Sequence, residues 1–123
     1  MTTISNIAQR ILDENNYTTS DISLVNLEYL IKNAVDHINL QAGTNVVFTP
    51  SGGTQSLTGT DSEILIIKIL SALLIRAYKD RGPNTAIQGL AVTTLITDPQ
   101  YNVFMKIVDE DISRLRGRSF KRT

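Results

Sequence analysis

The segment that most restricts the fold is ILIIKILSALLI, from Ile64 to Ile75, which is apolar on almost every side of a helix. Only Lys68 and Ser71 interrupt it. A helix with this pattern must be covered by other elements around most of its circumference, so the segment predicts a central helix. It is too short to span a bilayer, and we therefore expect a soluble protein with no membrane partner.

The residues before this run predict where the helix begins. Thr60 and Glu63 have the spacing of a capping box, in which each side chain accepts a hydrogen bond from the backbone of the other. Periodicity alone is also compatible with a buried strand at ILII, but the length and the cap favour a helix from about Asp61 to Lys79. Gly82 and Pro83 predict its end.

Three other segments have the apolar spacing of amphipathic helices. The first begins near Ile4. The second runs from about Ile22 to Leu40, stops at Ala42-Gly43, and has a buried stripe at Leu24, Leu27, Ile31, Ala34 and Ile38, widened by Val25, Leu30 and Val35. The last begins at Asp98-Pro99, ends at Gly117, and has a core face of Tyr101, Phe104, Val108, Ile112 and Leu115.

The connection between the second and third helices is long and polar. Its β-prone run, Val46 to Phe48, is followed by Pro50 and Gly52-Gly53, which predicts a small β-hairpin or an extended loop over residues 43–60. Val92 to Ile96 is compatible with a further short strand beside it. The expected fold class is mainly α: a four-helix bundle-like domain over residues 1–116 with this minor β element, and a basic tail over residues 117–123.

The charged residues are unevenly distributed. Twelve Lys and Arg balance twelve Asp and Glu, yet no acid follows Asp111, and the chain ends in SRLRGRSFKRT. This segregation predicts a surface with a defined partner at the basic end. The chain has no cysteine, which excludes disulfides, thiolate metal sites and cysteine nucleophiles. MTTISNIAQR lacks the basic-then-apolar order of a signal peptide, so we expect a soluble protein that is made inside a cell.

Few residues could support catalysis. His37 is the only histidine, and its neighbours predict a polar surface or a subunit contact. Asp109, Glu110 and Asp111 are consecutive, so on a helix they point about 100° apart; the spacing predicts that Glu110 pairs with Arg114. PSGGTQSLTG lacks the Lys-Ser/Thr ending of a phosphate-binding loop. We therefore expect no enzyme, no cofactor and no metal.

Two segments resemble a known family. LVNLEYLIKNAVDHINLQAG, followed after a loop by ILIIKILSALLIRAYKDRGPN with Tyr78 near its end, resembles the head–tail connector (adaptor, or head-completion) proteins of tailed bacteriophages. The resemblance covers Ser20 to Asn84, and beyond it this chain has an additional helix and the basic tail. It implies a non-enzymatic virion protein, assembled in the host cytoplasm, that forms a dodecameric ring beneath the portal. The ring extends the DNA channel, touches passing DNA non-specifically, and receives the stopper or tail-completion protein.

The resemblance also implies two contact regions. In several members of the family the C-terminal segment inserts between portal subunits, and by position that role here would fall to Arg114, Arg116, Arg118, Phe120, Lys121 and Arg122. The loop would contact a ring neighbour or the tail protein through Val46, Val47, Phe48, Pro50, Gly52 and Gly53. The alternative is a small DNA-binding or DNA-packaging protein that uses the basic C-terminal arm. Against that alternative, the loop between the second and third helices is too long for a helix-turn-helix.

Overall fold

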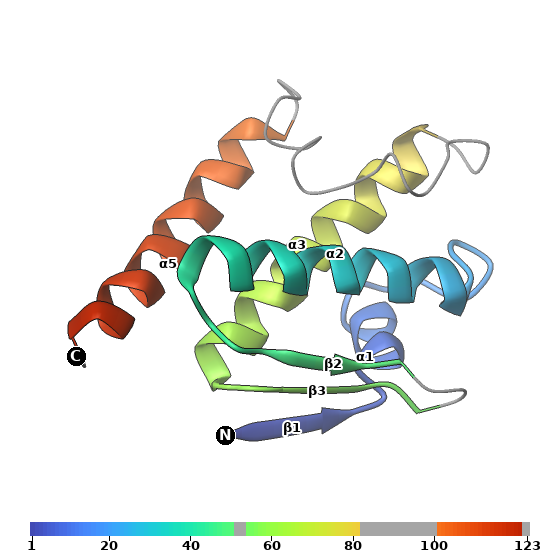
Figure 1. The fold of residues 1–123 in the computed structure, drawn as a ribbon. Coiled ribbons are helices and arrows are strands. Elements are labelled where there is room, and N and C mark those ends of the chain that lie inside the picture. The colour runs from blue at the N-terminus through green and yellow to red at the C-terminus, as the bar shows by residue number, and fades with distance from the viewer. Residues whose placement is uncertain (51–53, 82–100, 122–123) are drawn as a thin grey trace.

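A computed structural model describes residues 1–50, 54–81 and 101–121. Helices and strands follow one another in the order β1, α1, α2, β2, β3, α3 and α5 (Figure 1). Their bounds are β1 Thr2–Ser5, α1 Ile7–Glu14, α2 Leu24–Ala42, β2 Val47–Thr49, β3 Ser56–Gly59, α3 Asp61–Arg81 and α5 Asn102–Lys121. The predicted class is confirmed at this level: the described chain is mainly helical, with a small antiparallel sheet.

The core lies where α2 crosses α3 and α5 (Figure 1), and the three helices contact one another pairwise. Helix α1 contacts α2 and α3. The predicted stripe of α2 is buried at Leu27, Ile31, Ala34 and Ile38, with Leu30 and Val35 beside it. In α3, Ile67, Leu70 and Leu74 are fully buried, as expected for a central helix.

Several apolar residues that were predicted to be in the core are exposed instead. Val25 of α2 is 63% exposed, and Phe104 of α5 is 43% exposed. In α3, Leu65 and Ile69 are 58% and 38% exposed, so the helix is not covered all round. Helices α1, α2 and α5 and the strand β3 contact α3, and Leu65 and Ile69 lie on the part of its surface that these elements leave uncovered.

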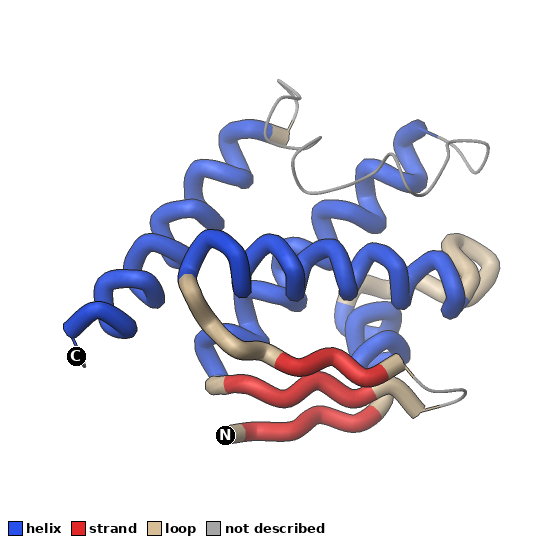
Figure 2. The backbone as a smooth tube through the Cα atoms, in the orientation of Figure 1, coloured by secondary structure: helices blue, strands red, loops and turns tan. Residues whose placement is uncertain are grey.

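The predicted hairpin is confirmed and is part of a larger sheet. Strand β2 pairs with β3 antiparallel, and β1 pairs with the other edge of β3, which gives the order β1-β3-β2 (Figure 2). Ile4, expected at the start of a helix, lies in β1 opposite Leu57. Helix α1 starts at Ile7 because Asn6 has the left-handed φ of 56° and separates strand from helix. Local periodicity could not detect a strand whose partner is so distant in sequence.

The predicted start of α3 and the predicted end of α2 are both confirmed. The Thr60 N–H donates to Glu63 Oε1 at 2.7 Å and the Glu63 N–H donates to Thr60 Oγ1 at 3.3 Å, which is the capping box. Helix α2 ends at Gly43, whose φ of 66° is left-handed. Gly82, Pro83, Asp98, Pro99 and the segment Val92 to Ile96 lie outside the described residues.

The end predicted for the last helix is wrong. Helix α5 passes Gly117 and continues to Lys121. A glycine inside a helix costs only about 1 kcal/mol relative to alanine, so it does not end a helix by itself. In Figure 1 the last turns of α5 extend away from the sheet and from the other helices.

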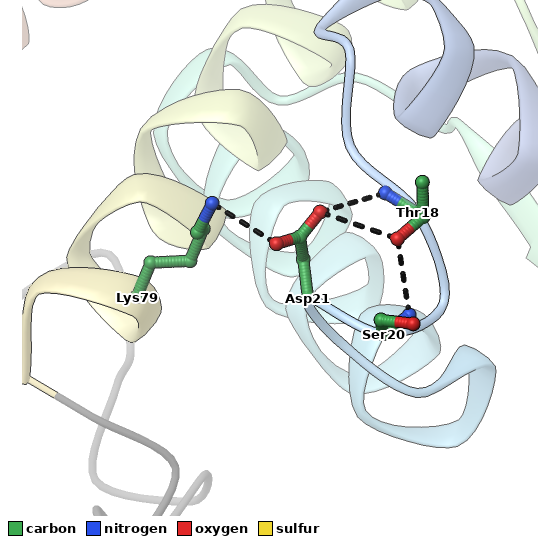
Figure 3. Close-up of polar contacts among 4 residues, drawn as sticks. All are labelled: Thr18, Ser20, Asp21 and Lys79. Carbon is green, nitrogen blue, oxygen red and sulfur yellow. Dashed lines mark hydrogen bonds and ion pairs between the residues drawn. The ribbon is translucent and has the colours of Figure 1, made fainter.

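The loop between α1 and α2 is fixed to α3 by Asp21 (Figure 3). Its carboxylate accepts a hydrogen bond from the Thr18 N–H at 2.8 Å and forms an ion pair with Lys79 Nζ at 3.1 Å. The Ser20 N–H donates a hydrogen bond to Thr18 Oγ1. The Thr18 backbone bond and then Lys79 lower the pKa of Asp21 below its ordinary value, because both favour the ionised form. Lys79 also lies over the Tyr17 ring, 4.8 Å from its centre. These contacts hold the start of α2 against the last turns of α3.

Candidate interaction surfaces

The predicted loop contacts divide into core residues and surface residues. Val46 is 4% exposed, and the Asn39 side chain bonds both its N–H and its carbonyl, so Val46 belongs to the core of the chain. Val47 is 52% exposed on the edge strand β2. Phe48 is half-buried and Pro50 is exposed. Gly52 and Gly53 lie outside the described residues.

An apolar groove runs between α2 and the hairpin. We define the α2–β2 groove by Val25, Tyr29, Val47, Phe48 and Pro50. One part, of about 280 Å³, is lined by Val25, Tyr29, Phe48 and Pro50, and an adjoining part, of about 320 Å³, extends along α2 to Asp36 and Val47. Val25 and Tyr29 are one turn apart, so both are on the exposed side of α2. The groove therefore presents aliphatic and aromatic side chains to the surroundings.

A second apolar surface lies on the other helices. We define the α3–α5 face by Leu65, Ile69, Phe104 and Ile107; Ile107 is 58% exposed. The two helices are antiparallel here: the Arg76 guanidinium of α3 lies 5.9 Å from the centre of the Phe104 ring. Further along, Leu65 shares a depression with Asp111 and Arg114. Ile69 and Ile107 fall between these two contacts, so the four apolar residues form one continuous surface.

The α2–β2 groove and the α3–α5 face point in opposite directions. Tyr78 of α3 accepts a hydrogen bond from Asn26 of α2, and Ile69, nine residues before Tyr78, lies about 180° round the helix. On α5 the side chains buried in the core are Met105, Val108 and Ile112, whereas Ile107 is 58% exposed. The α3–α5 face is therefore turned away from α2. Val25 and Tyr29 lie on the side of α2 opposite its buried stripe, so they are turned away from α3 and α5.

Charged residues border both apolar surfaces. The groove is lined by two acids and one base, Glu28, Asp36 and Lys32. The α3–α5 face is bordered by two bases, Arg76 and Arg114, and by two acids, Asp111 and the Asp80 carboxylate that Tyr101 bonds at the start of α5. Arg114 pairs with Asp111 at 3.2 Å, in place of the predicted pair with Glu110. The groove thus has an excess negative charge, whereas the α3–α5 face has charges of both signs.

His37 does not lie on a polar surface as the sequence predicted. It is half-buried, and its Nε2 atom makes no hydrogen bond within the described residues. Burial lowers the pKa of His37 because it disfavours the charged form, and the Asp109 carboxylate partly opposes this shift. His37 is therefore partly withdrawn from solvent.

We expect an NMR titration of His37, the only histidine, to give a pKa below its ordinary value of 6.5. Asp109→Asn should lower that pKa further, because it removes the charge that favours the imidazolium. Since the folded pKa is depressed, the stability that depends on neutral His37 is complete above pH 6.5 and is lost as the pH falls toward the folded pKa. Glu110→Gln is the matched control and should leave the titration unchanged. A His37 pKa above 6.5 would contradict this assignment.

The predicted portal-docking residues are described only in part. Arg114 is well exposed, with 72% of its side chain accessible. Arg116, Arg118, Phe120 and Lys121 lie on the backbone of α5, so most of the predicted tail is helical. Arg122 lies outside the described residues. The basic segment is thus a continuation of the helix that carries Phe104 and Ile107.

The sequence did not identify Tyr29, Leu65, Ile69 and Ile107 as interaction residues. One signal could have indicated them. The central helix is apolar on almost every side, and the few other helices of so short a chain cannot cover all of that surface. Among the described residues no three His, Cys, Asp or Glu side chains are grouped so that they could hold a metal ion. No helix within the described ranges is long and apolar enough to cross a membrane.

Comparisons with family models, with curated proteins and with solved structures found no match to this chain.

Proposed function

We propose that this chain is a structural adaptor of a tailed-bacteriophage virion. In this proposal copies with a bundle-like helical body associate side by side in a dodecameric ring beneath the portal. The ring extends the DNA channel without sequence-specific contacts and receives the stopper or tail-completion protein. The chain performs no catalysis, and its C-terminal basic segment docks on the portal.

The observation that carries this proposal is the pair of apolar surfaces on opposite sides of one chain. Surfaces of this kind, bordered by charged residues, mark sites of protein association. A protein that only binds DNA needs a basic surface and has no need for two apolar ones. The extension of α5 to Lys121 adds support, because a helix that projects from the body can reach a neighbouring protein.

The second candidate is DNA binding by the same basic segment. It is favoured by the placement of Arg114, Arg116, Arg118 and Lys121 along one helix. If about five cations each neutralised a phosphate, the logarithm of DNA affinity would fall with the logarithm of salt concentration with a slope near −4.5.

Deletion of residues 117–123 separates the two candidates. We expect attachment to portal-bearing capsids to be lost, with little change in DNA affinity measured across a salt series. Circular dichroism should show that the shortened protein stays folded, since the deletion starts beyond Leu115, the last core residue described. Loss of a strongly salt-dependent DNA affinity with attachment intact would overturn the adaptor proposal.

A matched variant tests which part of the segment docks. R116Q/R118Q/K121Q/R122Q keeps the chain length and Phe120 but removes four charges. If docking depends on charge, this variant attaches as poorly as the deletion does. Phe120→Ala keeps every charge, and a comparable loss there assigns docking to the aromatic ring.

A further inference from the structure

We propose that the two apolar surfaces are complementary to each other, so that the α3–α5 face of one copy packs into the α2–β2 groove of the next copy. This inference rests on the side-by-side association proposed above and names the contact that produces it. The occupant of the groove is thus a second copy of this chain. The contact is heterologous: different surfaces of the two copies meet.

The shapes of the two surfaces fit this pairing. The α2–β2 groove is recessed between a helix and an edge strand, with Phe48 and Pro50 on one side and Val25 and Tyr29 on the other. The α3–α5 face is formed by the outward side of two adjacent helices, where Leu65 and Ile107 are each 58% exposed. Packing the exposed aliphatic side chains of the face into the apolar groove removes apolar surface of both copies from water.

The charges favour the same pairing. Glu28 and Asp36 border the groove, whereas Arg76 and Arg114 border the α3–α5 face. Bringing groove to face places carboxylates near guanidinium groups. Pairing groove with groove places an excess of carboxylates opposite each other, and like-charge contacts select against that arrangement.

The opposite directions of the groove and the face determine which kind of oligomer this contact forms. Because the groove and the face point in opposite directions, each added copy leaves one groove and one face uncovered. Such a heterologous contact continues until the rotation between neighbours closes a ring, or else it yields an open filament. An isologous contact would stop at a dimer.

Cross-linking between single-cysteine variants tests the pairing, since the chain has no cysteine of its own. The variants are Tyr29→Cys in the groove and Ile107→Cys on the face, treated with a short flexible bis-maleimide at the highest soluble concentration. Ser113→Cys is the control, because Ser113 is exposed on the same helix as Ile107 but lies about 120° round from it.

We expect covalent dimers when Tyr29→Cys and Ile107→Cys are mixed, several-fold more than when Tyr29→Cys is mixed with Ser113→Cys. Neither variant alone should exceed that control, and a chain with both cysteines should give a ladder of higher oligomers. Dimers formed by one variant alone would show an isologous contact and overturn the inference. A mixture that gives no more dimer than the control would also overturn it.

A second measurement uses no cysteine. Ile107→Asp places a charge where the inference buries an aliphatic side chain, so light scattering should show loss of the oligomer, while Ser113→Asp should keep it. An unchanged oligomer with Ile107→Asp would contradict the pairing. This test is separate from the C-terminal deletion, which tests the adaptor proposal. If the deletion abolished capsid attachment but cross-linking showed isologous dimers, the pairing of groove and face would be refuted and the adaptor proposal would still stand.

Discussion

Tyr101→Ala is expected to destabilise the protein by about 3–5 kcal/mol, the range for truncating a fully buried aromatic side chain. Tyr101 is 1% exposed, immediately precedes α5, and donates its hydroxyl hydrogen to the Asp80 carboxylate near the end of α3. The substitution removes both the ring from the core and the hydrogen bond between the two helices. Urea unfolding should show a lower midpoint with an unchanged slope.

The conservative variant Tyr101→Phe separates the two contributions. It keeps the ring and loses the hydroxyl, so we expect a loss of about 1–2 kcal/mol, as for a hydrogen bond to a partly hydrated charged group. Because Tyr101 anchors the start of α5, Tyr101→Ala should also weaken any association that uses Phe104 and Ile107. An equal loss for both variants would mean that the hydroxyl alone, and not ring packing, holds α5 in place.

Leu57→Ala is expected to cost about 2–5 kcal/mol, the range for creating a cavity in a well-packed core. Leu57 is fully buried on the central strand β3, opposite Ile4 of β1 and Phe48 of β2. Its side chain is where the sheet packs against the helices, so truncation leaves a cavity that the two short edge strands cannot close easily.

The matched control is Val47→Ala on the edge strand β2. Val47 is 52% exposed, so its truncation should change the stability by about 0.5 kcal/mol or less. The two variants are compared by thermal and urea unfolding. If Leu57→Ala were no more destabilising than Val47→Ala, the sheet would not be part of the hydrophobic core.

Helix positions could be predicted because they depend on residues close together in the chain. The Thr60–Glu63 capping box and the left-handed Gly43 act on the backbone beside them, and both are found where the sequence placed them. The strand β1 could not be predicted, since it is defined by pairing with β3 more than fifty residues away. The end of α5 was missed because a single glycine weakens a helix without terminating it.

The candidate surfaces show the limit of periodicity. It correctly marked Val25, Leu65, Ile69 and Phe104 as apolar positions on helices, but it could not tell which apolar positions the chain covers by itself. That depends on how many elements surround each helix. The same hydrophobic pattern therefore predicts a core residue and an interface residue equally well.

By itself the sequence determined the helical class, the central helix, the hairpin and the basic end, because apolar spacing, caps and turn residues act locally. Only the tertiary structure decided that His37 is half-buried, that β1 completes the sheet, and that two apolar surfaces face opposite ways. These features arise from contacts between residues far apart in the chain. Whether an apolar side chain is covered depends on those contacts, and they exist only once the helices have packed.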